Sequence, residues 1–156
     1  MMRRVIPCLL ALAWPLAGGI GPALACPDPR AVPARWEAAT GRDLWSPAVF
    51  PVEAGGDTLL SRCGVGGRGH VRSPPDFLFD LSRMGRYDRL HVRSNADCDT
   101  VLLLRDPAGR WHFDDDSGTG RTASLSLADP ADGAYAIWVG TYRGRPCRAR
   151  LTLETF

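Results

Sequence analysis

Apolar and polar residues alternate with a period of two along most of the chain after residue 44. In the segment 76–81, Phe77, Phe79 and Leu81 fall on one face of an extended chain, while Asp80 falls on the other. This period is typical of a half-buried β-strand. The pattern predicts eight or nine short strands, drawn from the segments 49–52, 58–63, 76–81, 89–93, 101–104, 110–113, 123–127, 135–139 and 148–154.

Short turns rich in Gly, Pro and Asp separate these segments, and the pattern predicts no helix after residue 40. Many short strands at such spacing indicate an all-β fold, and we expect an antiparallel β-sandwich of the jelly-roll kind. The run 101–104 is apolar at every position, which suits a central strand covered on both faces. The segment 33–40 begins with Pro and is followed by Gly41, so it is expected to form a short helix or an irregular arm. We therefore divide the chain into an N-terminal arm, 26–44, and a sandwich domain, 45–156.

Residues 1–25 have the pattern of a secretory signal peptide. Arg3 and Arg4 precede a short apolar run, and Ala23-Leu24-Ala25 matches a small-x-small cleavage site. The run is too short for a membrane span, which needs about 20 apolar residues. We expect a periplasmic or secreted protein, with a lipoprotein acylated at Cys26 as the alternative.

Four cysteines remain after the predicted cleavage: Cys26, Cys63, Cys98 and Cys147. An even number in an exported chain predicts disulfides. Of the three pairings that four cysteines allow, we favour Cys26–Cys63, which would hold the arm, and Cys98–Cys147, which would link two late strands. A zinc site is the less favoured alternative, because these cysteines lack the close pairs that structural zinc sites use.

The basic residues are all arginine and are scattered among aspartates, so no basic stripe forms along the chain. Binding to a phosphate backbone needs such a stripe. We therefore expect no nucleic-acid partner.

Several motifs together resemble the bacterial pre-peptidase C-terminal domain family, over about residues 55–155. The resemblance implies a secreted, non-catalytic, jelly-roll-like sandwich that aids secretion, stability or substrate binding, with calcium bound in some members. Because no protease domain precedes the module in this chain, we expect no role in cis. The motifs are Pro75–Phe79, Asp99–Leu104, Asp106-Pro107-x-Gly109, Asp114–Gly118 and Gly133-x-Tyr135-x-Ile137-x-Val139-Gly140.

An acidic loop is the best candidate for a metal site. Ca²⁺ prefers six to eight oxygen ligands, which carboxylates and backbone carbonyls of a loop can supply. The alternative is a solvated turn, in which aspartates bind their own backbone. The candidate calcium ligands are Asp97, Asp99, Asp114, Asp115 and Asp116.

Aromatic residues form a second candidate site, a surface on which sugars could stack. Trp111, Trp138 and Tyr142 are its candidates, with burial in the sandwich core as the alternative. Trp36 and Trp45 are expected to pin the arm to the sandwich.

The sequence favours a non-catalytic binding or accessory module whose partner is a secreted protein or a polysaccharide. One alternative is an accessory or inhibitor that acts in trans on a secreted protease. The other is a small hydrolase using His112 beside the aspartates. This last alternative is disfavoured because the chain has no Gly-x-Ser-x-Gly motif around a nucleophile.

Overall fold

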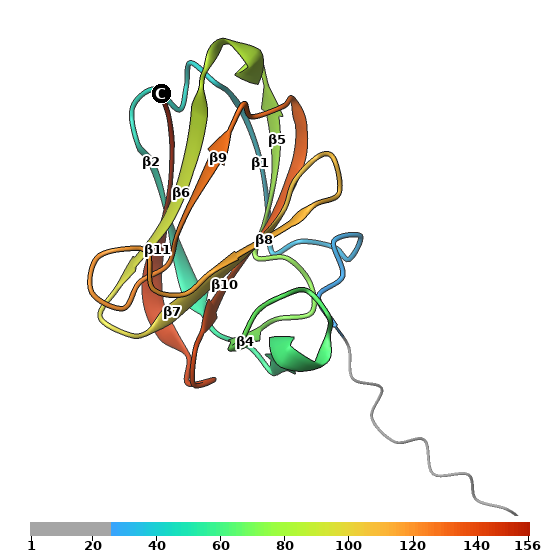
Figure 1. Cartoon of the computed structure of the whole chain (residues 1–156), viewed down its shortest axis with the longest axis vertical. Helices are drawn as coiled ribbons and strands as arrows, with labels where there is room; N and C mark the ends of the chain where they lie inside the picture. Colours follow the sequence, from blue (N-terminus) through green and yellow to red (C-terminus); the bar gives the residue numbers. More distant parts are fainter. Residues whose placement is uncertain (1–25) are drawn as a thin grey trace, which may run out of the picture.

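Two β-sheets pack face to face in the computed structural model, which describes residues 26–156 (Figure 1). The predicted all-β sandwich is confirmed, while the predicted signal peptide lies outside the described residues. Helical structure in residues 26–156 is limited to two short 3₁₀ turns, η1 (Leu60–Arg62) and η2 (Met84–Arg86). Within the same residues, no helix is long and apolar enough to cross a bilayer.

Sheet A is organised around one long central strand, β10. Strands β5 and β4 pair with successive parts of one side of β10, and β7 pairs with its other side. Beyond these, β1 continues the sheet from β5, β3 from β4, and β8 from β7. The strands of sheet A are β1 (Arg35–Thr40), β3 (Thr58–Leu59), β4 (His70–Val71), β5 (Phe77–Ser82), β7 (Thr100–Arg105), β8 (Trp111–Asp114) and β10 (Gly133–Thr141).

Sheet B has four strands in the order β2-β11-β6-β9, and every neighbouring pair is antiparallel. Strand β2, which contains Pro51, is at one edge, where a residue without an N–H is tolerated. The strands of sheet B are β2 (Ala48–Ala54), β6 (Arg89–Ala96), β9 (Ser124–Ala128) and β11 (Cys147–Thr155).

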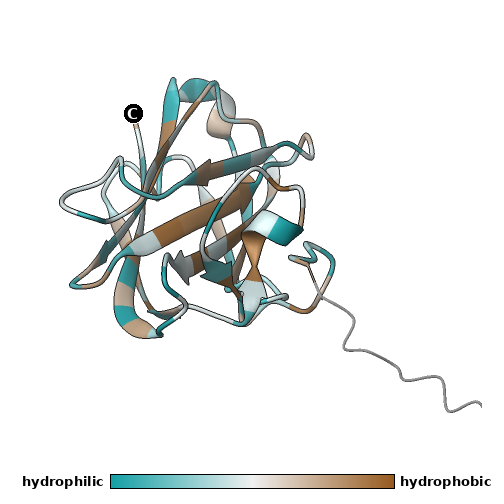
Figure 2. Ribbon diagram, turned by 60° about the horizontal axis from the view of Figure 1, so that its bottom comes forward, coloured by the Kyte–Doolittle hydropathy of each residue, from teal (hydrophilic) through white to brown (hydrophobic). Residues whose placement is uncertain are grey.

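The main core lies between the two sheets. Period-two alternation places Phe77 and Phe79 of β5 inward, where their rings pack 5.6 Å apart and against Phe50 of β2. Apolar residues concentrate on the strands and polar residues on the loops and strand ends (Figure 2). Burial of this apolar surface is the main stabilising contribution in such a fold.

A second, smaller core lies on the outer face of sheet A. Strand β7 contributes to both cores, since Leu102 and Leu104 face the other sheet while Val101 and Leu103 face outward. The predicted burial of this strand on both faces is confirmed. The outer side chains pack with Trp138 and with residues of the segment 60–71, which folds over this half of the sheet.

The N-terminal arm is partly a strand, so the helical alternative for 33–40 is wrong. Strand β1 pairs in parallel with β5, with Arg35 opposite Phe77 and Thr40 opposite Ser82. Local propensity is a weak guide for a short segment, and pairing with a neighbouring strand overrides it. The pair β1–β5 is also the one parallel pair within residues 26–156 of a sandwich expected to be antiparallel.

The segment 58–63, expected to be one strand, is a strand only at its first two residues. The chain then turns through η1, so that Leu60 enters the second core and Cys63 reaches the arm. These two tertiary contacts explain why the strand ends early.

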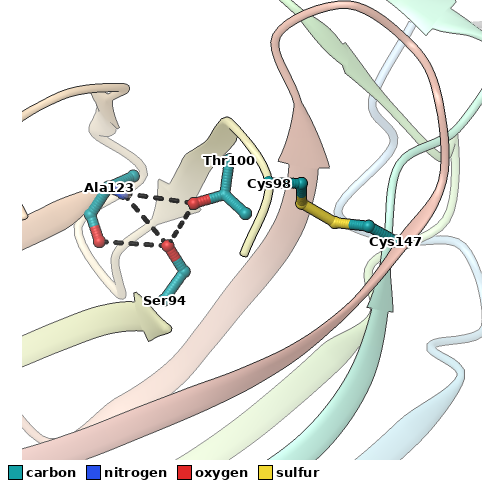
Figure 3. Close-up of a disulfide and its surroundings, with 5 residues drawn as sticks. All are labelled: Ser94, Cys98, Thr100, Ala123 and Cys147. Atoms are coloured by element: carbon teal, nitrogen blue, oxygen red, sulfur yellow. Dashed lines mark hydrogen bonds between the residues drawn. A yellow bond between two sulfur atoms is a disulfide. The ribbon is translucent and has the colours of Figure 1, made fainter. Parts of the chain in front are cut away.

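Both favoured disulfides form. Cys26–Cys63 joins the arm to the end of η1, and Cys98–Cys147 joins the β6–β7 loop to the start of β11. In Figure 3 the second bridge lies near the buried hydroxyls of Ser94 and Thr100, whose oxygen atoms are 2.6 Å apart. The Ala123 amide donates to both hydroxyl oxygens, which ties the loop before β9 to this end of the sandwich.

Candidate functional site

The acidic loop is organised around Asp114, the last residue of β8. Its Oδ1 accepts a hydrogen bond from the Ser117 hydroxyl at 2.5 Å, and its Oδ2 accepts from the Ser117 amide at 3.0 Å. Oδ2 also accepts from the amide of Ser124, the first residue of β9, at 2.8 Å. Asp114 therefore bridges the two sheets and closes its own turn, which supports the turn interpretation for this residue.

Asp115 and Asp116 lie in this turn, and Asp99 is close enough for its charge to act on Asp115. Burial, followed by the charges of Asp116 and Asp114 and then that of Asp99, raises the pKa of Asp115 above its usual value. Within residues 26–156, no group of three or more His, Cys, Asp or Glu side chains has an arrangement that could hold a metal ion. Calcium binding by Asp97, Asp99, Asp114, Asp115 and Asp116 stays a prediction.

The three candidate aromatic residues do not share a surface. Trp138 is fully buried, because the segment 60–71 covers it, and its indole N–H donates to the Ser73 carbonyl at 3.3 Å. The prediction that Trp138 contributes to a ligand surface is therefore wrong. Trp111 is half-buried against Trp138, at a ring separation of 5.4 Å. Tyr142 is 37% exposed but follows the opposite end of β10, beside Asp99.

A different row of side chains crosses the open half of the outer face of sheet A. Residues paired in register on neighbouring strands lie on the same face. Trp36 of β1 pairs with Leu78 of β5, Leu78 with Ala136 of β10, Ala136 with Arg105 of β7, and Arg105 with Trp111 of β8. The row therefore spans five strands, which at about 4.8 Å per strand is roughly 19 Å.

A groove of about 640 Å³ lies over the middle of this row, and neither Trp36 nor Trp111 lines it. Leu78 and Ala136 line its apolar part, and Arg105, Arg30 and Asp132 line its polar part. The guanidinium of Arg105 lies 5.4 Å from the centre of the Trp111 ring, so it covers that ring at the end of the row.

Sequence analysis missed the other end of the row. Trp36 was expected to pin the arm, yet it is 60% exposed on the outer face, and Trp45 is 63% exposed. The alternation of Trp36 with Arg35 and Glu37 was the available signal, because it suits a strand with one solvated face.

The histidine expected beside the aspartates, His112, instead contacts the buried Asp106 at the start of a turn. Its Nε2 lies 3.0 Å from Oδ2 of Asp106, which also accepts a hydrogen bond from Nε of Arg110, while Oδ1 accepts one from the Arg110 amide. Burial favours a higher pKa for Asp106, but the hydrogen bonds from His112 and Arg110 outweigh it and lower the pKa. The group closes the Asp-Pro-Ala-Gly turn between β7 and β8.

A second histidine makes a contact that the sequence did not indicate. His91 of β6 lies 2.6 Å from the Ser124 hydroxyl on β9, through its Nε2. Burial, together with Arg93, lowers the pKa of His91, although Glu154 acts in the opposite direction. The contact joins neighbouring strands of sheet B, and none of the cavities described here is lined by either residue. The pair is consistent with a cross-strand hydrogen bond.

Comparison with known proteins gives little further guidance. No family model matches the chain, and no curated protein matches it. Among solved structures, the chain is similar to PliG of Aeromonas hydrophila, a periplasmic inhibitor of g-type lysozyme. The two are 13% identical with a TM-score of 0.45, over 78% of this chain and 100% of that chain. No function is carried from that protein to this chain, and the resemblance to the pre-peptidase C-terminal family stays a prediction.

Proposed function

We propose that this protein is an exported, non-catalytic binding module that holds a polysaccharide in the groove on the outer face of sheet A. The observation that carries the proposal is the row from Trp36 to Arg105. The exposed Trp36 ring is next in register to Leu78 at the border of the groove, and Leu78, Ala136 and Arg105 line the groove itself. The two disulfides support export, since such bonds persist in oxidising compartments.

The chemistry of the groove suits a sugar chain. Sugar rings have apolar faces that stack on an exposed indole, and their hydroxyls bind charged and polar side chains. Trp36 supplies such an indole, while Arg105, Arg30 and Asp132 supply donors and acceptors. All of the row lies on paired strands, which hold binding groups more firmly than loops do.

A protein segment suits the groove less well. Protein interfaces depend on a few anchors that fill deep apolar pockets. The floor of this groove is instead made of small residues, Gly133, Ala134 and Ala136, with Leu78 beside them. The alternative is an accessory protein or inhibitor that binds a secreted protein, and the experiment must distinguish it from a polysaccharide-binding module.

The test is binding to a panel of insoluble and soluble polysaccharides that includes peptidoglycan, followed by a comparison of two tryptophan variants. Trp36→Ala is expected to weaken binding at least tenfold without changing the thermal midpoint, because the ring is exposed. Trp45→Ala is the matched control, since Trp45 is equally exposed but does not belong to the row.

Two outcomes would contradict the proposal. In one, both tryptophan variants lose the same fraction of binding, which would indicate nonspecific adsorption through exposed indoles. In the other, no polysaccharide binds while a purified envelope protein binds through Trp36, which would favour the protein partner.

A further inference from the structure

An arginine-lined cavity of about 500 Å³ lies at the end of the sandwich where β5 ends and β6 begins. Arg42, Arg83 and Arg86 line it together with Gly85 and Tyr87. In Figure 1 this is the end that carries the loop after β5 and the label of the C-terminus. The cavity shares no lining residue with the groove on sheet A. We call it the arginine pocket.

Within residues 26–156, none of these three arginines lies within 4.0 Å of a carboxylate in an ion pair. The arginines that do form such pairs are Arg35, Arg72, Arg93 and Arg110. Three like charges around one cavity repel each other, and a bound anion would relieve this repulsion.

Asp43 lies close enough to the arginine pocket for the charges of Arg83 and Arg42 to affect its pKa, and its carboxylate already has hydrogen-bond partners. Asp43 Oδ2 accepts hydrogen bonds from the Thr40 amide at 2.8 Å and the Thr40 hydroxyl at 2.7 Å. These hydrogen bonds, with smaller contributions from Arg83 and Arg42, lower the pKa of Asp43, so it stays charged. Three guanidinium groups line the pocket, whereas the Asp43 carboxylate does not.

The backbone at Arg83 has a conformation that favours glycine. Arg83 has φ 57° and ψ 33°, in the left-handed region. A residue other than glycine is strained there, and such positions cluster at ligand sites. The next residue holds the turn in place, because Met84 is fully buried and its amide donates to Asp132 Oδ1 at 2.6 Å. The chain thus has an arginine at position 83, where glycine would adopt the same backbone conformation without strain.

The ring of Tyr87 forms one wall of the pocket. This ring lies directly on Gly41, where an added Cβ would overlap it. Glycine at 41 therefore allows the close approach that positions Tyr87 against the arginines.

We propose that the arginine pocket binds a ligand bearing a phosphate or sulfate group. Guanidinium groups bind such tetrahedral anions through paired N–H donors, and three of them can engage several oxygens at once. A phosphate or sulfate group offers more acceptor oxygens to three guanidinium groups than a carboxylate, which has two. The size of the cavity suits a small charged group, and the neighbouring Tyr87 offers a face for a ring attached to it.

The experiment measures binding of inorganic phosphate, pyrophosphate and sulfate by calorimetry and by thermal shift, with chloride at equal ionic strength as the reference. We expect these anions to raise the thermal midpoint of the full chain more than chloride does. A sugar phosphate and inorganic phosphate are then compared. Tighter binding of the sugar phosphate identifies a phosphorylated saccharide as the source, and equal binding identifies the free anion.

The decisive variant is Arg83→Gly. It should weaken anion binding at least tenfold, while the midpoint without ligand stays unchanged or rises because glycine adopts this backbone freely. Arg86→Gln gives a second variant that leaves the backbone unchanged and should also weaken binding.

Two controls separate the pocket from general effects. Asp129→Gly relieves the other non-glycine residue with a left-handed backbone within residues 26–156, at φ 47°, and should not weaken anion binding. Arg145→Gln removes an exposed positive charge far along the chain and should do the same. The proposal is overturned if the anions act no better than chloride, or if Arg145→Gln and Arg83→Gly reduce binding equally.

Discussion

Asp76 Oδ2 accepts a hydrogen bond from the Val139 amide at 2.8 Å, at the point of β10 where pairing with β5 has ended and pairing with β4 has not begun. The carbonyl of the same Val139 accepts a hydrogen bond from the Gly55 amide at 3.0 Å. The Asp76 carboxylate thus takes the place of a strand carbonyl in the middle of sheet A. Arg72 holds the other oxygen, at 3.0 Å.

This arrangement predicts a pH-dependent stability. Burial raises the pKa of Asp76 from 3.8 to about 6, despite the opposing hydrogen bond from Val139 and the charge of Arg72. Between about pH 4 and 6, the Asp76 carboxyl is therefore still protonated in the folded state, whereas it is already ionised in the unfolded state. The contribution of this group to the free energy of unfolding is therefore full below about pH 4. It falls by roughly 3 kcal/mol as the pH rises through 6.

The measurement is urea unfolding of the wild type and Asp76→Asn at pH 4, 5, 6 and 7. The difference in the free energy of unfolding between the two should change steadily across this range and level off above it. A difference that stays constant with pH would show that the Asp76 carboxyl does not titrate in the folded protein with a raised pKa.

Asp114 is expected to stabilise the fold without any ligand. Asp114→Ala removes the acceptor of the Ser117 and Ser124 amides, and we expect a loss of about 1–3 kcal/mol in the free energy of unfolding. Asp116→Ala, at an exposed position of the same loop, is the control and should change stability by less than about 0.5 kcal/mol. Denaturant unfolding in a chelator measures both.

The calcium prediction can be tested on the same samples. If Asp97, Asp99, Asp115 and Asp116 hold Ca²⁺ with Asp114, millimolar Ca²⁺ raises the thermal midpoint of the wild type, and Asp114→Ala removes the increase. A midpoint that does not respond to Ca²⁺ or to chelator contradicts calcium binding.

The two cores on either side of β7 should respond separately to mutation. Leu102→Ala and Leu103→Ala each remove a fully buried side chain, and each should cost about 2–5 kcal/mol. Only Leu103→Ala opens the outer core, so hydrogen exchange in the segment 60–71 should rise in that variant and not in Leu102→Ala. Equal exchange in this segment would contradict the division into two cores.

Removal of each disulfide in turn should affect the protease resistance of the arm and of the sandwich differently. Each pair of Cys→Ser changes is expected to cost about 2–4 kcal/mol. Loss of Cys26–Cys63 should in addition expose the arm to trypsin at Arg30, while the sandwich stays folded. Loss of Cys98–Cys147 should leave the arm protected. Mass spectrometry after limited proteolysis gives the cleavage sites, and early cleavage of the arm in both variants would contradict this assignment.

The strands of the sandwich were predictable because their signal is local. Phe77, Phe79 and Leu81 alternate with Leu78 and Asp80 on the opposite face, and Gly or Pro residues mark most turns, so the period of two was visible in the sequence. The favoured cysteine pairing was also correct, because a small exported chain has few ways to connect four cysteines. Alternation alone does not say which strand lies beside which.

The binding surfaces depend on this non-local information. Trp36 and Trp111 are far apart in the sequence, and only the order β1-β5-β10-β7-β8 places them in one row. Alternation along β10 places Trp138 on the outer face of sheet A, where a side chain could be exposed. It is buried because the segment 60–71 folds over it. Likewise, Arg42 and Arg83 meet only because the β1–β5 pair brings the turns at their ends together.

The amino-acid sequence by itself determined the all-β class and the positions of most strands, because a strand's two faces are set by neighbouring residues. The tertiary structure alone decided that the arm adds a strand, that one face of sheet A is half covered, and that three arginines share a cavity. These features arise from contacts between segments far apart along the chain, and no local pattern encodes such contacts.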